Sequence, residues 1–585
     1  MANTEQKIAG GMFLFVDADA DSIVTPEDFT EEQRMIAQLT EDFVNNELET
    51  RQEEAEMHLD IELCKQLLRA AGEVGLLAAE IPERFEGMDI DKVSVMLINE
   101  KIGTNPSFMV SFGGQTGIGS LPIVYFGNED QKRRYLPGVA SGEKLASYAL
   151  TEPSAGTDAL GARTTARLSE DGKYYILNGS KQFISGAGFA DFFIVFAKVN
   201  GTDFTAFIVD NPSEGLTVGA EEKKMGLKGS STCALTFEDV KVPVENVLGE
   251  IGKGHVIAFN ILNIGRLKLA AGTLGLSKLA LELSAKYANE RKQFGRPISS
   301  FPLIGRKLAD MAIRTYVLES MLYRTAGALD QGLHGLDNQA PTYGADSAKA
   351  IAEYALECSI NKVFGSEAVA FATDEGVQIH GGYGFTQEYR IERMYRDCRI
   401  FRIFEGTNEI NRMLIPDMLL KKSLKGELPA FGAAVPETGG GDEALAAEGA
   451  ILRKAKAVCR GLFAEAQAVF GKGLSGEQEL CANLADIVIA IYGLESALLR
   501  ARKMIRRAGE AKAAHAARMT TAYAHEALET IRRLAGEAVC RLKKPEDRAE
   551  ALAALNAALA AEPVSLIEIK RSIAEQIIQA EKYVV

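Results

Sequence analysis

The spacing of hydrophobic residues changes twice along the chain, which predicts a helical region, a β region and a second helical region. Before residue 148, apolar side chains recur every three or four positions, as Ile36, Leu39 and Phe43 do, and this spacing is typical of amphipathic helices. Thr25 followed by Pro26 is typical of a helix start. Between residues 148 and 252, apolar and polar residues alternate, which predicts strands.

Glycine-containing pairs divide the β region into short segments. Asp171-Gly172, Asn178-Gly179 and Asn200-Gly201 each lie between runs rich in β-forming residues. Such pairs favour two-residue hairpin turns, because type I′ turns need a positive φ at both central residues. The region is therefore expected to be an antiparallel β domain.

Helical spacing returns at residue 253. The stretch ILNIGRLKLAAGTLGLSKLALELSAKYANERKQFG predicts one long helix with small residues on one face, and Gly295 is a natural cap for it. The segment 426–442 is rich in Pro and Gly and is expected to be a linker. The Ala-rich, amphipathic segment 443–585 predicts a further small helical bundle.

These patterns together predict an α+β multidomain protein that is mostly α. The expected domains are an N-terminal helical domain (25–147), a middle antiparallel β-barrel-like domain (148–252), a C-terminal helical bundle (253–425) and, after the linker, an appended helical domain (443–585).

Composition narrows the class of protein. The net charge of -15, from 65 basic and 80 acidic residues, argues against a nucleic-acid binder. No run of about 18 apolar residues is present, so no transmembrane helix is expected. The first residues resemble neither a signal nor a transit peptide, so a cytoplasmic location is expected.

Cysteine and histidine usage bears on redox state and metals. The seven cysteines are scattered and form no CxxC pair, which predicts reduced and mostly buried thiols. The six histidines form no HExxH motif and no Cys/His cluster, so no metal site is expected.

The stretch RIFEGTNEINR (402–412) contains a candidate catalytic acid. Thr407 is a plausible N-cap of the following helix, and Glu409 would lie in its first turn, where the helix dipole favours an acid. Glu405 precedes this cap, so the helix start does not require it. Gly406 allows the backbone to turn sharply and to approach a ligand closely.

Two interpretations of Glu405 follow from its neighbours. Ile403 and Phe404 could supply apolar walls, and a carboxylate held against such walls becomes a stronger base. Such a base could remove a proton from a weak carbon acid. The alternative, which these residues alone favour, is a surface glutamate at a helix entry.

Two segments of the β region could bind a cofactor. YALTEPSAGTDAL (148–160) offers hydroxyls and open backbone N–H groups that could hold phosphates or the polar rim of a planar ring. In GSKQFISGAG (179–188), Phe183 could stack on a flavin while Ser185 bonds a ring nitrogen. The alternatives are a turn rich in small polar residues and an ordinary core phenylalanine.

Seven segments in order along the chain resemble the acyl-CoA dehydrogenase family. They are IPERFEG, YALTEPSAGTDA, KQFISGAGFAD, FEDVKVPVENVLGE, NERKQFGRPI, QIHGGYGF and RIFEGTNEINR, and the resemblance covers about residues 25–423. It implies that FAD lies between the β domain and the C-terminal helical domain, with part of its site supplied by a second subunit.

The resemblance implies roles for particular residues, with Glu405 as the catalytic base. The implied cofactor-binding residues are Tyr148, Leu150, Thr151, Gly156, Thr157, Phe183, Ile184, Ser185, Thr407 and Glu409, with Arg291, Phe294, Gln378, Gly381 and Gly382 from the partner subunit. The implied substrate-binding residues are Thr157, Asn263, Arg266, Phe404, Gly406, Gly113 and Gly114.

Three features refine the resemblance. The appended helical domain is similar to that of the very-long-chain enzymes, which implies a homodimer. Some members carry the base on the long helix near the position of Gly265, and a glycine cannot serve there. At the position of the family's last FAD contact, Glu409 is longer than the acid usual in very-long-chain enzymes, which puts its contact with FAD in doubt.

The implied reaction is α,β-dehydrogenation of an acyl-CoA in fatty acid β-oxidation, with Glu405 removing the pro-R α-proton, flavin N5 accepting the β-hydride, and electron-transferring flavoprotein as the electron acceptor. Gly113 and Gly114 leave the far end of the acyl pocket open, which favours medium to long chains, although they could serve helix packing alone. The alternatives are an acyl-CoA oxidase that uses oxygen, and a scaffold or assembly protein on the same fold.

One basic stretch raises the question of membrane contact. From Arg500 to Arg518 every charged residue is basic except Glu510. This stretch could lie on the anionic inner face of a membrane, or it could be a solvated face of the bundle.

Overall fold

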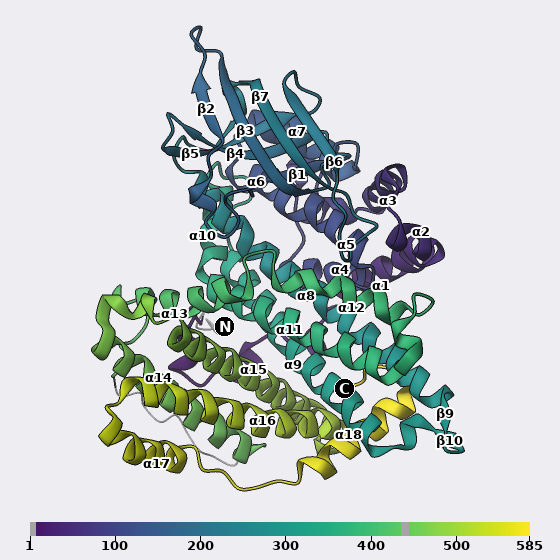
Figure 1. The fold of residues 1–585 in the computed structure, drawn as a ribbon, viewed down its shortest axis with the longest axis vertical. Helices are drawn as coiled ribbons and strands as arrows, with labels where there is room; N and C mark the ends of the chain where they lie inside the picture. The colour runs from purple at the N-terminus through teal and green to yellow at the C-terminus, as the bar shows by residue number, and fades with distance from the viewer. Residues whose placement is uncertain (1–7, 434–443) are drawn as a thin grey trace. The chain divides into compact units, whose positions relative to one another are not determined.

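The computed structural model describes residues 8–433 and 444–585, so much of the predicted linker lies outside the described residues. The chain divides into two compact units (Figure 1). The β unit contains Thr30–Gly275 and Gly332–Ala352, and the helical unit contains Met1–Phe29, Leu276–Gln331 and Glu353–Val585.

Helices form the first part of the β unit, as the hydrophobic spacing predicts. They are α1 (Glu31–Phe43), α2 (Gln52–Met57), α3 (Ile61–Glu73), α4 (Lys92–Ile102), α5 (Pro106–Gly113), α6 (Leu121–Phe126) and α7 (Glu129–Ser141), and α10 (Tyr343–Glu353) also belongs largely to this unit. The N-cap of α1 is Thr30, whose hydroxyl accepts the N–H of Gln33. Thr25 and Pro26 instead begin a short 3₁₀ turn, because Asp28 closes a capping box with Thr25 after only three residues.

An eight-stranded sheet follows these helices. Its strands are β1 (Ala146–Ala149), β2 (Thr165–Leu168), β3 (Tyr174–Ser185), β4 (Phe192–Val199), β5 (Asp203–Asp210), β6 (Leu216–Glu221), β7 (Thr232–Pro243) and β8 (Val247–Leu248). The order is β6-β7-β3-β2-β4-β5-β8, with β1 also paired to β4. Most pairs are antiparallel as predicted, but β1 and β2 each run parallel to β4. The sheet is therefore mixed.

The three predicted hairpin turns have different outcomes. Asp171-Gly172 joins the antiparallel strands β2 and β3, and Asn200-Gly201, with φ of 53° and 79°, joins β4 and β5. The turn predicted at Asn178-Gly179 is wrong, because this pair forms a bulge inside β3. A Cβ on Gly179 would lie 2.8 Å from the Cα of Thr164, so glycine permits this close approach.

The helical unit consists of long helices. Helix α8 (Gly254–Glu290) enters it from the β unit, and then follow α9 (Pro302–Leu333), α11 (Ala355–His380), α12 (Arg390–Cys398), α13 (Asn408–Leu424), α14 (Ala446–Phe470), α15 (Gln478–Ala508), α16 (Glu510–Leu542), α17 (Arg548–Ala558) and α18 (Leu566–Ala580). Figure 1 shows α14, α15 and α16 side by side. Gly295 is not the cap of α8, because it lies in a turn between β9 (Lys292–Gln293) and β10 (Arg296–Pro297).

Helix α15 is long and apolar enough to cross a membrane by length and composition, in contrast to the expectation from the sequence. In this structure 83% of its most apolar window is buried inside the protein. Such burial is typical of a helix at the centre of a bundle, and α14 and α16 flank α15 here.

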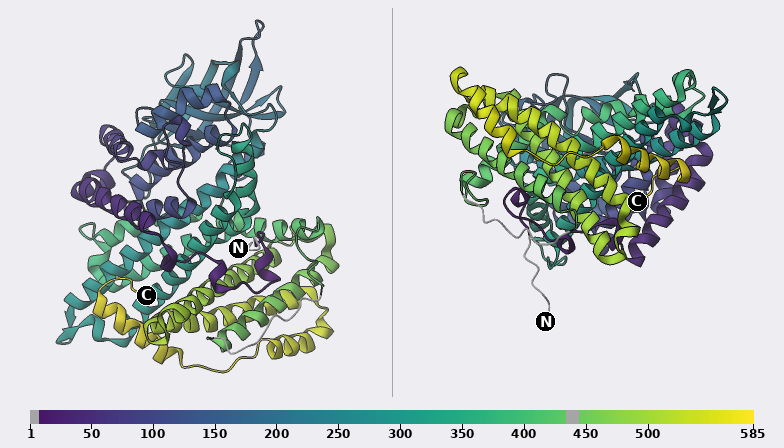
Figure 2. Two further views of the ribbon diagram at one scale, coloured as in Figure 1. Left: turned by 180° about the vertical axis from the view of Figure 1, so that it is seen from behind. Right: turned by 90° about the horizontal axis from the view of Figure 1, so that it is seen from below.

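The N-terminal segment Ile8–Phe29 lies along the appended helices, as Figure 2 shows. Asp28 accepts hydrogen bonds from Lys503 and Arg507, Glu27 pairs with Arg500, and the Arg506 guanidinium reaches Asp19 and Asp21. These acids neutralise much of the basic stretch that raised the question of membrane contact. Membrane contact of this stretch stays a prediction.

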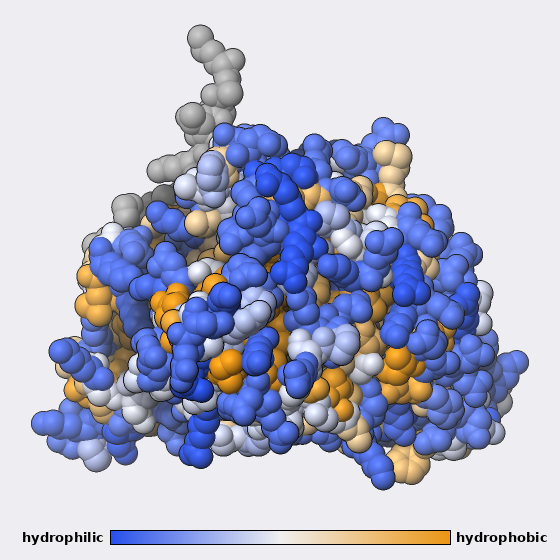
Figure 3. Space-filling model, turned by 90° about the horizontal axis from the view of Figure 1, so that it is seen from above, coloured by the Kyte–Doolittle hydropathy of each residue, from blue (hydrophilic) through white to orange (hydrophobic). Residues whose placement is uncertain are grey.

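The surface seen in Figure 3 is mostly polar, and its apolar side chains form small patches separated by polar ones.

The cysteines are as expected from the sequence. All seven are free, and six of them are buried, which confirms the expectation of reduced and mostly buried thiols.

Candidate active site

Glu405 occupies a strained turn directly before helix α13. Its φ is 58° and that of Gly406 is 78°, so both residues are in the left-handed region. This conformation costs a non-glycine residue about 1–2 kcal/mol, so neighbouring contacts must hold it. One carboxylate oxygen of Glu405, Oε2, is shielded from solvent.

Two side chains hold the backbone of this turn. The Lys362 ammonium, from α11, donates to the Gly406 carbonyl and to Asn408 Oδ1, each at 2.7 Å. Asn411 Nδ2 donates to the carbonyls of Gly406, at 2.8 Å, and Thr407, at 3.0 Å. The turn is therefore fixed from α11 on one side and from α13 on the other.

The helix start is served by other residues, as predicted. The Thr407 hydroxyl accepts the N–H of Ile410 and so caps α13, and Glu409 lies in the first turn. A hydrogen bond from its own backbone N–H holds the pKa of Glu409 below its usual range. Glu405 is therefore not the residue that caps this helix.

The apolar surroundings of Glu405 differ from the expectation. Phe404 is half-buried, and its ring stacks on that of Phe401 with centroids 5.7 Å apart. Ile403 is 47% exposed. Phe401 is buried and packs on Phe404, whereas Ile403 is exposed and does not form the apolar wall expected of it.

In the β unit, the segments predicted to bind a flavin lie beside each other. The N–H of Gln182 donates to the Thr151 carbonyl at 2.9 Å, and the Ser147 hydroxyl donates to the Ser185 carbonyl at 2.8 Å. The chain around 148–157 and the end of β3 therefore form one continuous surface. Tyr148 is buried, and its ring packs edge-on against that of Phe196.

A buried ion pair that sequence reasoning missed anchors the loop 150–157. Lys181 Nζ donates to Glu152 Oε1 at 2.8 Å and to the Leu150 carbonyl at 3.2 Å. The Glu152 carboxylate also accepts the N–H groups of Arg163 and Thr164. Burial alone would raise the pKa of Glu152, but Lys181 and the Arg163 N–H outweigh it and hold the pKa low.

The remainder of the loop is open. Gly156 and Thr157 are exposed, and no atom of the described residues lies within 4 Å of a Cβ placed on Gly156. Phe183 is 62% exposed at φ 58°, on an irregularity of β3. Ile184 is buried behind it in the core of the sheet. An exposed aromatic ring beside open backbone groups can hold a planar polar ligand.

The predicted substrate residues of the β unit lie on α8 and near α5. Arg266 Nη1 donates to Asn263 Oδ1 at 3.1 Å, and both side chains are buried. Gly113 ends α5 and Gly114 begins a π-helical turn. Among the described residues no atom lies within 4 Å of the Cβ position of either glycine, so the space beside them is open.

The residues expected to serve a second subunit lie on the surface of the helical unit. Phe294 is 93% exposed at the tip of the β9–β10 hairpin, and Gln378, Gly381 and Gly382 are exposed at the end of α11. The Arg291 guanidinium lies 5.5 Å from the centroid of the Tyr383 ring, which joins the two segments. The structure therefore brings these residues together on one surface.

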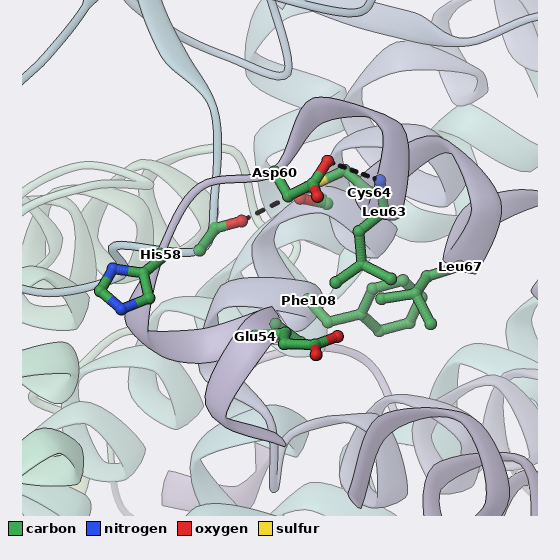
Figure 4. Close-up of a pocket in the computed structure, with 10 residues that line it drawn as sticks. Glu54, His58, Asp60, Leu63, Cys64, Leu67 and Phe108 are labelled. Carbon is green, nitrogen blue, oxygen red and sulfur yellow. Dashed lines mark hydrogen bonds between the residues drawn. The ribbon is translucent and has the colours of Figure 1, made fainter. Parts of the chain in front are cut away.

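A small crevice opens elsewhere in the β unit, between α3 and α5 (Figure 4). Leu63, Leu67 and Phe108 form its apolar wall, and Cys64 Sγ donates to the Gly229 carbonyl at its edge. None of the predicted site residues lines this crevice.

Known proteins match the chain over most of its length. The family model described as acyl-CoA dehydrogenase, N-terminal domain, matches residues 30–143, the middle-domain model matches 147–240, and two models described as C-terminal domain match 252–420 and 452–556. A probable acyl-CoA dehydrogenase of Bacillus subtilis is 50% identical and covers 98% of each chain.

Two further matches bear on the appended helices and the cofactor. The human very long-chain specific acyl-CoA dehydrogenase, mitochondrial, is 37% identical over 79% of this chain and 73% of its own. The crystal structure of an acyl-CoA dehydrogenase complexed with FAD from Bacillus anthracis is 49% identical, with a TM-score of 0.95 over 99% of this chain and 100% of that chain.

Proposed function

Because the chain is a member of the acyl-CoA dehydrogenase family, we propose that it α,β-dehydrogenates a medium- to long-chain acyl-CoA, as a step of fatty acid β-oxidation, with Glu405 as the base. The observation that carries this proposal is the turn of Glu405. A carboxylate that the helix cap does not use is held there in a strained conformation, with one oxygen shielded from solvent. Strain of this kind is typical of functional sites.

FAD is the cofactor, and the β unit fits it. The open loop at Gly156 and Thr157 would hold its polar groups, and Phe183 to Ser185 would lie along its ring. When bound, FAD supplies the acceptor for the β-hydride of the substrate. The ion pair of Glu152 and Lys181 keeps the loop in place.

The protein's own part in the reaction is the proton step. The Glu405 carboxylate takes the α-proton and becomes a neutral carboxylic acid. The backbone N–H of Glu405 would donate to the thioester carbonyl, which acidifies the α-carbon, and this polarisation is stronger where water is excluded. Asn263 and Arg266 would line the arm that carries the thioester.

Replacement of the base tests the proposal. Glu405→Gln keeps the size of the side chain but cannot accept the proton, so it should retain FAD absorbance and lose turnover with an artificial electron acceptor by about a thousandfold or more. Asp417→Asn, on the exposed face of α13, is the matched control and should turn over normally. Near-normal turnover of Glu405→Gln would remove the assignment.

Chain length is tested separately. The open space beside Gly113 and Gly114 supports a deep acyl pocket. Across a series of acyl-CoA lengths, the wild type should be active on medium and long chains, and Gly114→Val should move the optimum to shorter chains. If activity ends at short chains in the wild type, the deep pocket is contradicted.

The electron acceptor and assembly are part of the same proposal. Electron-transferring flavoprotein is the proposed acceptor, and the exposed surface of Phe294 and Gly381 supports a homodimer. Oxygen uptake with substrate and no other acceptor would indicate an oxidase instead. Sedimentation velocity of the holoenzyme measures the assembly, and a monomer would contradict it.

A further inference from the structure

Lys362 is a buried cation that the proposed mechanism does not use. It lies on helix α11, and its side chain is fully buried. A buried ammonium is costly unless hydrogen-bond acceptors surround it. Its location therefore calls for a reason beyond packing.

Two acceptors of the Lys362 ammonium belong to the Glu405 turn and to the helix start that follows it. The Gly406 carbonyl follows the base directly, and Asn408 begins the helix after it. Asn408 in turn donates to Ser366 Oγ and to Glu367 Oε1, and both of these residues also lie on α11. The charge of Lys362 thus ties the turn to one rigid helix.

The backbone conformation of this turn is one that contacts with neighbouring residues must hold. Glu405 and Gly406 are left-handed, a conformation that a tetrahedral Cβ disfavours at position 405. The Gly406 carbonyl receives two donors, Lys362 Nζ and Asn411 Nδ2, which fixes the direction of the peptide between the base and the helix. A charged donor makes the stronger of such hydrogen bonds.

We propose that Lys362 is a positioning residue, which fixes the left-handed turn by holding the Gly406 carbonyl and Asn408 and so directs the Glu405 carboxylate at the substrate α-carbon. The inference rests on the proposed function of Glu405. Without the ammonium, the turn can relax toward an unstrained conformation, and the carboxylate moves out of line with the proton.

The test compares buried lysines of the same unit. Lys362→Met removes the donor, and Lys456→Met is the matched control, because Lys456 is equally buried but binds Glu495 and the Val16 carbonyl instead. For each holoenzyme we would measure flavin absorbance per chain, the thermal midpoint, kcat and KM, and exchange of the substrate α-proton in D₂O by NMR.

Lys362→Met should lower kcat and α-proton exchange by roughly tenfold to a hundredfold, the effect of one hydrogen bond to a charged group. Its KM should change by less than about threefold, since only an interaction of the proton step is lost. Lys456→Met should lower the thermal midpoint without this loss of exchange.

If the substrate α-proton exchanges no more slowly with Lys362→Met than with Lys456→Met, the inference is overturned. If Lys362→Met does not hold FAD, Lys362→Arg carries the test, because it keeps the charge but displaces the donors and should exchange more slowly than wild type. If Lys362→Arg then exchanges the α-proton as fast as the wild type, the inference is overturned. Glu405→Gln in the same series separates the two ideas, because an active Glu405→Gln contradicts the proposed function itself.

Discussion

Buried lysines hold the backbone of segments in each of the two units. Lys181 binds the Leu150 carbonyl, Lys362 binds that of Gly406, and Lys268 on α8 binds that of Thr116 in the π-helical turn. An ammonium can serve several carbonyl and carboxylate oxygens at once, so one side chain can fix a loop that has no ladder of its own. Such contacts connect residues far apart in sequence, which explains why no local pattern predicted them.

Acid should weaken the cluster around Lys268. Glu80 lies between the ammonium groups of Lys92 and Lys268. Burial alone would raise its pKa, but the two lysines lower it to about 2 from an ordinary value of 4.5. Because the folded pKa is depressed, the stabilisation is complete above pH 4.5 and is lost as the pH falls toward 2.

Urea unfolding as a function of pH measures this effect. The wild type should lose about 3 kcal/mol from this carboxylate between about pH 5 and pH 2. Glu80→Gln should be less stable at pH 7, since two buried ammonium groups lose their counter-charge, and its unfolding free energy should fall less steeply with acid. The same slope in both proteins would contradict this account of Glu80.

At the scale of elements, glycines on α8 set how closely another helix approaches. A Cβ on Gly275 would lie 1.9 Å from the Glu100 carbonyl oxygen of α4, and a Cβ on Gly103 would lie 2.5 Å from the Gly272 Cα. The backbones of α4 and α8 therefore touch without side chains between them. The small-residue face of the long helix was predicted, but its partner was not.

Gly275→Ala should therefore destabilise the β unit. The methyl group cannot fit against a backbone oxygen, so the helices must separate, at a cost of about 1–3 kcal/mol or more. Gly461→Ala on α14 is the control, because among the described residues no atom lies within 4 Å of its Cβ position and it should be neutral or stabilising. Equal unfolding midpoints for the two variants would contradict the close approach.

Regular elements could be predicted from the sequence more reliably than bulges and irregular turns. The spacing of hydrophobic residues and the residue types at turns predicted the long helix, the hairpin at Asn200-Gly201 and the cap at Thr407, because these features depend on neighbours in the chain. The bulge at Asn178-Gly179 depends on Thr164 across the sheet, and the hairpin at Gly295 depends on pairing of two very short strands. The left-handed turn of Glu405 and Gly406 likewise receives a hydrogen bond from Lys362, 43 positions earlier, which no local pattern reveals.

At the scale of the whole molecule, charge holds the appended helices in register with the helical bundle. Along α9 and α15, Glu319 pairs with Arg500 and Arg324 with Glu495, and all four side chains are buried. Each helix carries its acid five residues before its base, and the two helices run antiparallel. A shift by about five residues would therefore bring Glu319 opposite Glu495 or Arg324 opposite Arg500. Lys456 of α14 joins the same network through Glu495.

Removal of one member of this network should weaken the whole helical unit. Arg324→Met deprives Glu495 of its bond to α9 and should lower the free energy of unfolding by about 3–5 kcal/mol, because it leaves a buried carboxylate with less compensation. Arg533→Met on α16 is the control, since its partner Glu537 is exposed and such pairs contribute less than about 1 kcal/mol. Urea unfolding followed by circular dichroism measures both. If Arg324→Met costs no more than the control, packing of α15 rather than charge holds the appended helices, and the register argument fails.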